Sequence, residues 1–128
     1  MNKEILIVER NKPTLNILKT VLNDHHVEVL TDGRSVLKRL EEGVCPDLII
    51  MDPDLPDQPD WQLVEHLSHH HAFSSIPLMV LSDGSEEETR SRVVAHGVMD
   101  YFFKPFNPES LARSVENIFV SRAMGPIY

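Results

Sequence analysis

Cysteine is almost missing from this sequence, in which Cys45 is the single example. One thiol cannot form an internal disulfide, and Cys45 has neither a second cysteine nor a nearby histidine for a redox or zinc site. Long apolar runs are missing too, because the segment Ile5–Val8 is too short for a signal-peptide core or a membrane span. We therefore expect a cytoplasmic protein that is neither secreted nor inserted in a membrane.

Basic residues are scarce relative to acidic ones. The chain has 12 Lys plus Arg against 20 Asp plus Glu, so its formal net charge is −8. Such a surface repels nucleic-acid backbones and anionic membranes. We therefore expect that these residues do not bind nucleic acid.

With 128 residues, 41% of them hydrophobic, the chain suits one globular domain. We place that domain at 1–122 and expect 123–128 to be a C-terminal tail or the start of a linker.

Short apolar segments alternate with segments of helical spacing. The predicted strands are 4–8, 27–30, 47–51, 77–81 and 99–103. A run such as Leu48–Met51 is apolar at every position, which is typical of a strand covered by helices on both faces. Alternating strands and helices with short connections predict right-handed crossovers. The sequence thus predicts an α/β fold, a doubly wound five-stranded parallel sheet of the (βα)5 type.

Capping residues mark the helix boundaries. Ser85 and Glu88 form a capping-box pattern, and Asn107 precedes a proline at a first helical position. Asp32 supplies a turn and a cap before the second helix, and Gly97 is a typical C-terminal stop.

In the last helix the apolar spacing buries one face and leaves another free for a partner or a second copy of the chain. The buried residues are Leu111, Val115, Ile118 and Phe119, and the free ones are Arg113, Glu116 and Asn117.

Polar residues follow the predicted strands at their carboxyl ends, where ligands bind in doubly wound sheets. They are Glu9 and Arg10 after the first strand, Asp52 after the third, Ser82 and Asp83 after the fourth, and Lys104 with Pro105 after the fifth. Carboxylates, a hydroxyl and an ammonium group are thereby predicted in one pocket. A purely structural ion pair between Asp52 and Lys104 is the alternative explanation.

Three motifs in order make the chain resemble the receiver domains of two-component response regulators, from about residue 5 to about residue 119. They are PDLIIMD at 46–52 with Leu55-Pro56, IPLMVLS at 76–82, and DYFFKPF at 100–106. The resemblance implies the flavodoxin-like receiver fold, with Asp52 as phosphoacceptor, Lys104 and Ser82 as phosphate-binding and switch residues, and Tyr101 as the switch aromatic. It also implies a cis peptide bond between Lys104 and Pro105.

The resemblance implies a signalling role rather than that of an enzyme, beyond self-catalysed phosphoryl transfer. A histidine kinase or phosphotransfer protein would donate the group, Mg²⁺ would assist, and the surface of the fourth helix, fifth strand and fifth helix would change. An output domain or a homodimer would read this change.

Arg10 departs from the family pattern, because a second acidic residue usually stands there and is a principal Mg²⁺ ligand. The remaining carboxylates, Glu9, Asp52 and Asp54, would be weak ligands, so we expect Mg²⁺ to bind weakly or not at all. Arg10 either pairs with Asp52 or Glu9 in place of the metal or points into solvent.

Further departures define an atypical receiver. Asp83 stands where a small residue is usual, and with Glu9 and Asp54 it makes the pocket acidic. Asp60 replaces a glycine, and together with Trp61 it is interpreted as a cap of the third helix. These features keep open a pseudo-receiver, an interaction module independent of phosphate. A small flavodoxin-like cofactor binder is disfavoured, because the sequence lacks a glycine-rich phosphate loop.

Four histidines at 66, 69, 70 and 71 form a cluster. His66 and His70 are four residues apart and can share a helix face as metal ligands. A solvated helix end that gains charge in mild acid is the interpretation we favour, because no cysteine completes a ligand set.

Overall fold

A computed structural model describes residues 2–124, in which five parallel strands form one sheet in the order β2-β1-β3-β4-β5. The strands are β1 (Glu4–Val8), β2 (His26–Leu30), β3 (Leu48–Met51), β4 (Leu78–Ser82) and β5 (Asp100–Phe103). The predicted α/β fold class is confirmed, and no strand end differs from its predicted position by more than one residue. One displacement matters for the site, because Ser82 is the last residue of β4 and not the first after it.

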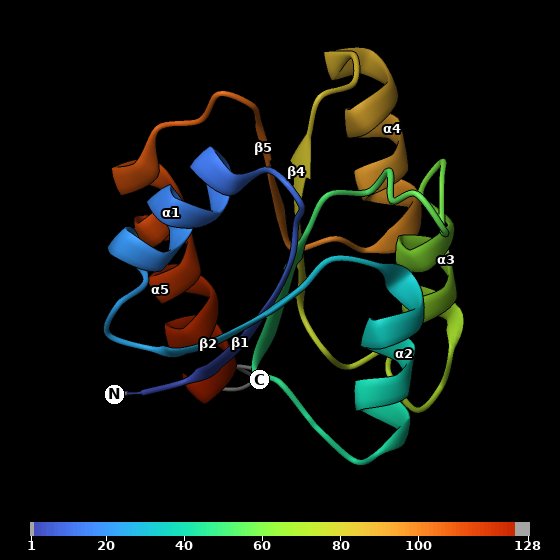
Figure 1. Cartoon of the computed structure of the whole chain (residues 1–128), viewed down its shortest axis with the longest axis horizontal. Coiled ribbons are helices and arrows are strands. Elements are labelled where there is room, and N and C mark those ends of the chain that lie inside the picture. Colours follow the sequence, from blue (N-terminus) through green and yellow to red (C-terminus); the bar gives the residue numbers. More distant parts are fainter. Residues whose placement is uncertain (1, 125–128) are drawn as a thin grey trace.

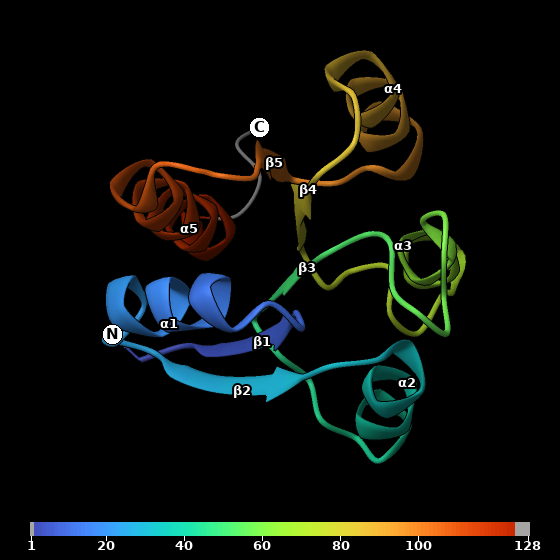
Figure 2. The ribbon, with the colours of Figure 1, turned by 45° about the horizontal axis from the view of Figure 1, so that its top comes forward.

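Five helices cover the two faces of the sheet within the described residues (Figure 1). They are α1 (Lys12–Val21), α2 (Gly33–Glu41), α3 (Gln62–His69), α4 (Glu86–His96) and α5 (Pro108–Met124). Figure 2 shows α1 and α5 on one face and α2, α3 and α4 on the other. The first two residues of the expected tail at 123–128 are therefore helical, and the rest lie outside the described residues.

Two buried clusters explain why the central strands are apolar throughout. Alternate side chains of a strand point to opposite faces, so Ile5 and Ile7 pack under α1 and α5, and Leu6 and Val8 pack under α2, α3 and α4. The four α5 residues predicted to be buried belong to the first of these clusters. No helix in the described part of the chain is long and apolar enough to span a membrane.

Most predicted caps are present. The Asp32, Ser85 and Asn107 side chains each accept a hydrogen bond from a backbone N–H three residues on, at 2.7–3.2 Å. Asn11, which was not predicted as a cap, accepts in the same way from Thr14 N at 2.9 Å at the start of α1. Gly97 ends α4 in the left-handed region, with φ 65°. The Lys104–Pro105 bond is cis, as predicted.

Two local predictions are wrong. Asp60 and Trp61 do not cap α3 through a side chain; both adopt positive φ, 54° and 66°. The capping box is only half formed, because Glu88 pairs with Arg92 at 3.2 Å. On α5, Arg113, Glu116 and Asn117 are exposed as predicted, and the carboxylate of Glu116 also lies 2.6 Å from Nε2 of His25.

Candidate functional site

Backbone hydrogen bonds beyond the strand ends place the polar residues beside one another. Asp52 N donates to Val8 O at 3.1 Å, which aligns the residue after β3 with the end of β1. Lys104 N donates to Ser82 O at 3.0 Å and aligns the residue after β5 with the end of β4. The parallel register therefore brings four chain segments to one edge of the sheet.

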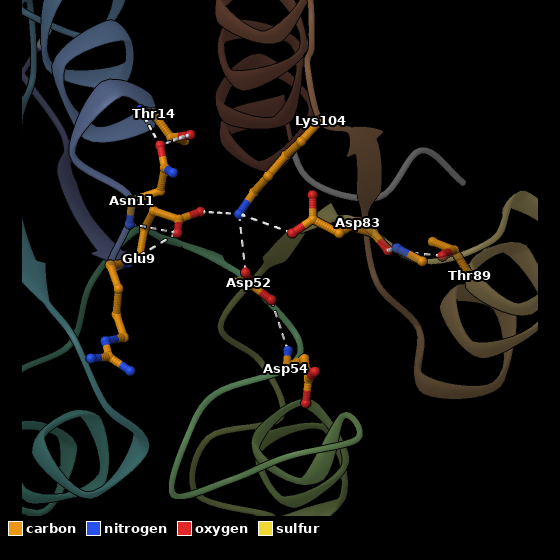
Figure 3. Close-up of polar contacts among 11 residues, drawn as sticks. Glu9, Asn11, Thr14, Asp52, Asp54, Asp83, Thr89 and Lys104 are labelled. Atoms are coloured by element: carbon orange, nitrogen blue, oxygen red, sulfur yellow. Dashed lines mark hydrogen bonds and ion pairs between the residues drawn. The ribbon is translucent and has the colours of Figure 1, made fainter.

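Lys104 is the centre of the site (Figure 3). Its Nζ lies 2.5 Å from Glu9 Oε1, 3.0 Å from Asp52 Oδ2 and 3.9 Å from Asp83 Oδ2. The side chains of Glu9, Lys104 and Asp52 are 4%, 12% and 18% exposed, whereas that of Asp83 is 72% exposed. The sequence prediction that Glu9, Asp52, Asp83 and Lys104 share one pocket agrees with this geometry.

Burial and charge shift two pKa values in this group. Burial raises the pKa of Asp52, and the nearby Glu9 adds to the rise; hydrogen bonds from Asp54 N and Lys104 only partly oppose it. Burial lowers the pKa of Lys104, but its hydrogen bonds and attraction to Glu9 and Asp52 outweigh burial, so the pKa is raised overall. Lys104 is therefore charged at neutral pH, and one ammonium faces several carboxylates.

Backbone N–H groups donate to one oxygen of the Glu9 carboxylate and to one oxygen of the Asp52 carboxylate. Glu9 Oε2 accepts from Arg10 N at 2.9 Å and Asn11 N at 3.1 Å, and Asp52 Oδ1 accepts from Asp54 N at 2.8 Å. These contacts leave Glu9 Oε1 and Asp52 Oδ2 directed at Lys104 (Figure 3). The Asp54 carboxylate itself accepts from Asp60 N at 3.0 Å and thus folds the β3–α3 loop.

Arg10 is exposed and lines a cavity of about 630 Å³ together with Asp52 and Lys104. Within residues 2–124 it pairs with neither Asp52 nor Glu9, so of the two alternatives for Arg10 the structure shows the solvent-directed one.

A divalent-cation site is not formed by this arrangement. Among the described residues, no three Asp, Glu, His or Cys side chains converge as ligands. Lys104 lies between Glu9 and Asp52, and Asp54 is used by the loop. Because Mg²⁺ needs several oxygens in octahedral geometry, these three carboxylates do not fit it as they stand.

The hydroxyl groups of Ser82 and Tyr101 form no hydrogen bond with the side chain of Asp52 or of Lys104 within the described residues. The Ser82 hydroxyl is 2.9 Å from Thr89 Oγ1 and accepts from Gly84 N at 3.0 Å. The Tyr101 hydroxyl accepts from Arg90 Nε at 3.4 Å. The sequence prediction did not include Thr89. It lies one helical turn after the Ser85 cap, and this spacing could have predicted that Thr89 faces β4.

A second cavity, of about 440 Å³, opens on the other side of Asp52, between the β3–α3 loop and the start of α4. Arg92 of α4 connects the helix to the β3–α3 loop. Its guanidinium lies 2.8 Å from Asp60 Oδ1, donates to Asp60 O at 3.1 Å, and lies 5.7 Å from the centre of the Trp61 ring. Asp52 borders both cavities, so a small molecule can reach its carboxylate from either of them.

The histidine cluster forms stacked contacts instead of a metal site. His70 packs on Phe73 with ring centres 4.6 Å apart, and His69 meets His96 of α4 at 5.5 Å. His66 and His70 are 5.6 Å apart, but no third ligand joins them in the part of the chain that the structure describes. His66, His69 and His71 are exposed and His70 is half-buried, which agrees with the predicted solvated helix end.

Comparisons with known proteins agree with the geometry. The family model described as the response regulator receiver domain matches residues 5–116. The chain is 32% identical over 120 residues to the phosphate regulon transcriptional regulatory protein PhoB of Escherichia coli, which covers 92% of the chain and 52% of PhoB. It spans only 8% and 12% of two histidine kinases that it also matches.

Two solved structures share the fold. The receiver domain of a signal transduction histidine kinase from Syntrophus aciditrophicus has a TM-score of 0.80 and 28% identity, with 92% of this chain and 90% of that one covered. The receiver domain of sensor histidine kinase PA1611 from Pseudomonas aeruginosa has a TM-score of 0.79 and 24% identity, with 94% and 100% covered. The latter holds a magnesium ion in its active site cleft.

Proposed function

Since this chain belongs to the response regulator receiver domain family of two-component systems, we propose that Asp52 accepts a phosphoryl group. The observation that carries the proposal is the contact of the Asp52 carboxylate with Lys104 at 3.0 Å, at the carboxyl edge of the sheet and open to two cavities. A carboxylate in that place can act as a nucleophile, and the ammonium can offset the charge of phosphoryl oxygens.

In the proposed reaction an Asp52 oxygen attacks the phosphorus of a phosphohistidine. The new O–P bond forms as the P–N bond breaks, and the imidazole leaves with the electron pair and takes up a proton. Lys104 then faces the phosphoryl oxygens as well as Glu9, which stays fixed by its backbone hydrogen bonds. We further propose that Mg²⁺ binds weakly here, because Arg10 supplies no ligand oxygen and Lys104 occupies the space between the carboxylates.

The proposed donor is a histidine kinase or a phosphotransfer protein, in keeping with the kinase relatives. The proposed readout is the surface of α4, β5 and α5, where Tyr101 already contacts Arg90 of α4. An output domain or a second copy of the chain would use that surface, with the segment from residue 123 as a link.

A cytoplasmic location belongs to the same proposal, supported by the single exposed cysteine.

Intact mass measurement tests the phosphoacceptor. The purified chain, treated with acetyl phosphate with and without Mg²⁺, should gain the mass of one phosphoryl group. Asp52→Asn should abolish this gain, and Asp54→Asn, a carboxylate two residues away, should keep it. An unlabelled parent would favour the phosphate-independent interaction module, and labelled Asp52→Asn would place the acceptor elsewhere.

A further inference from the structure

The hydroxyl of Thr89, in the first turns of α4, contacts the hydroxyl of Ser82 at the end of β4. Their oxygens are 2.9 Å apart, and Ser82 and Thr89 are only 2% and 1% exposed. A buried hydroxyl that loses its partner is destabilised, because water cannot replace the lost hydrogen bond. The pair therefore fixes the direction of both side chains.

The loop after β4 restricts the hydrogen-bond partners and the orientation of the Ser82 hydroxyl. Gly84 N donates to the Ser82 hydroxyl at 3.0 Å and uses one of its lone pairs. A side chain at Gly84 would begin 3.3 Å from Ser82 Oγ and 3.5 Å from Thr89 Oγ1, so the loop is packed closely around the pair. Thr89 is in turn held rigidly, since its N–H donates to Ser85 O at the capped start of α4.

We infer that Thr89 is a positioning residue that holds the Ser82 hydroxyl in a resting direction, away from Asp52. The inference rests on the proposed phosphorylation of Asp52 and on Ser82 as the group that binds the phosphoryl oxygens. Either hydroxyl of the pair can be the donor. We take Ser82 as the donor; since a hydroxyl has one proton to donate, Ser82 then has to give up its bond to Thr89 to donate to a phosphoryl oxygen. Phosphorylation is thereby transmitted to α4 through Thr89.

Thr89→Val keeps the shape of the side chain and removes the hydroxyl. Because a neutral hydrogen bond has a modest net effect, we expect the switched population of the unphosphorylated protein to rise about two- to tenfold. The amide signals of Gly84 and of α4 in ¹⁵N–¹H spectra should move from their resting positions toward those of the acetyl-phosphate-treated parent. Thr89→Ser, which restores a hydroxyl, should leave them at the resting positions.

The same substitution in a Ser82→Ala background separates positioning from a merely structural role. There Thr89→Val should not shift the amide signals toward the phosphorylated positions, because the hydroxyl on which Thr89 acts is gone. Equal shifts in both backgrounds, or none in either, would overturn the role of Thr89 while leaving Asp52 as the phosphoacceptor. A parent that acetyl phosphate does not label would overturn the proposed function and this inference together. If Thr89→Val does not fold, Thr89→Ala serves in its place.

Discussion

Replacing Lys104 by methionine removes the ammonium that contacts both Glu9 and Asp52, with little change in side-chain volume. Removing one partner of a buried ion pair costs about 3–5 kcal/mol, because the other charge is left unpaired in a poorly solvated place. Glu9 keeps two backbone hydrogen bonds, at 2.9 and 3.1 Å, and Asp52 is partly exposed, so we expect the lower end of that range. A loss of about 3 kcal/mol corresponds to a melting temperature lower by about 10 °C in a domain of this size.

The pH dependence identifies the cause of this loss. Burial raises the pKa of Asp52 and Lys104 opposes that rise, so without Lys104 the Asp52 carboxyl is protonated more readily in the folded than in the unfolded chain. Such a raised folded-state pKa stabilises the fold below the unfolded-state pKa, and this contribution is lost as pH rises. The deficit of Lys104→Met relative to the parent should thus be largest at neutral pH and shrink toward about pH 4, near the ordinary pKa of an aspartate.

Thermal and urea unfolding of parent and variant at several pH values measure this effect. Lys12→Met is the matched control, since Lys12 is exposed at the start of α1, and it should leave stability nearly unchanged. Adding Glu9→Gln to Lys104→Met should recover a large part of the loss. A deficit below about 1 kcal/mol at neutral pH, or one that is equal at pH 4, would refute the argument from unpaired buried charge.

Three further outcomes follow from the site. Arg10→Asp should give a larger Mg²⁺-dependent rise in melting temperature than the parent, because it adds a ligand oxygen; an equal or larger rise in the parent would show that other residues bind the ion. Asp52→Asn should stabilise the protein at neutral pH, with a gain that vanishes as pH falls, because the raised Asp52 pKa makes the ionised carboxylate unfavourable in the fold; a loss at neutral pH would contradict that sign. Arg92→Ala should cost about 1 kcal/mol and change the fluorescence of Trp61, the single tryptophan; an unchanged spectrum would mean that Arg92 does not hold the Asp60–Trp61 turn.

Local patterns predicted the scaffold because the interactions behind them act over a few residues. The apolar runs identified the strands, since a strand buried on both faces has no room for polar residues. Helix starts at Asp32, Ser85 and Asn107 follow from side chains that bond to an N–H three positions on. The site residues after the strands could be predicted for the same reason, because a parallel sheet brings its carboxyl ends to one edge.

Where the prediction failed, a distant partner decided the conformation. Asp60 and Trp61 look like a cap in sequence, but Arg92, some thirty residues later, bonds to Asp60 and lies over the Trp61 ring. Asp54, predicted as an added pocket acid, lines the cavity of about 440 Å³ together with Asp52, and its carboxylate also accepts a hydrogen bond from the backbone of its own loop.

The sequence by itself determined the order of strands and helices, the sheet edge that carries the site, and the residue types gathered there. Only the tertiary structure decided which of those side chains touch: Lys104 contacts both Glu9 and Asp52, Arg10 turns to solvent, and Ser82 pairs with Thr89. The physical reason is that secondary structure arises from local periodicity and capping. The direction of a polar side chain instead depends on burial and on partners from other segments, whose positions exist only once the chain has folded.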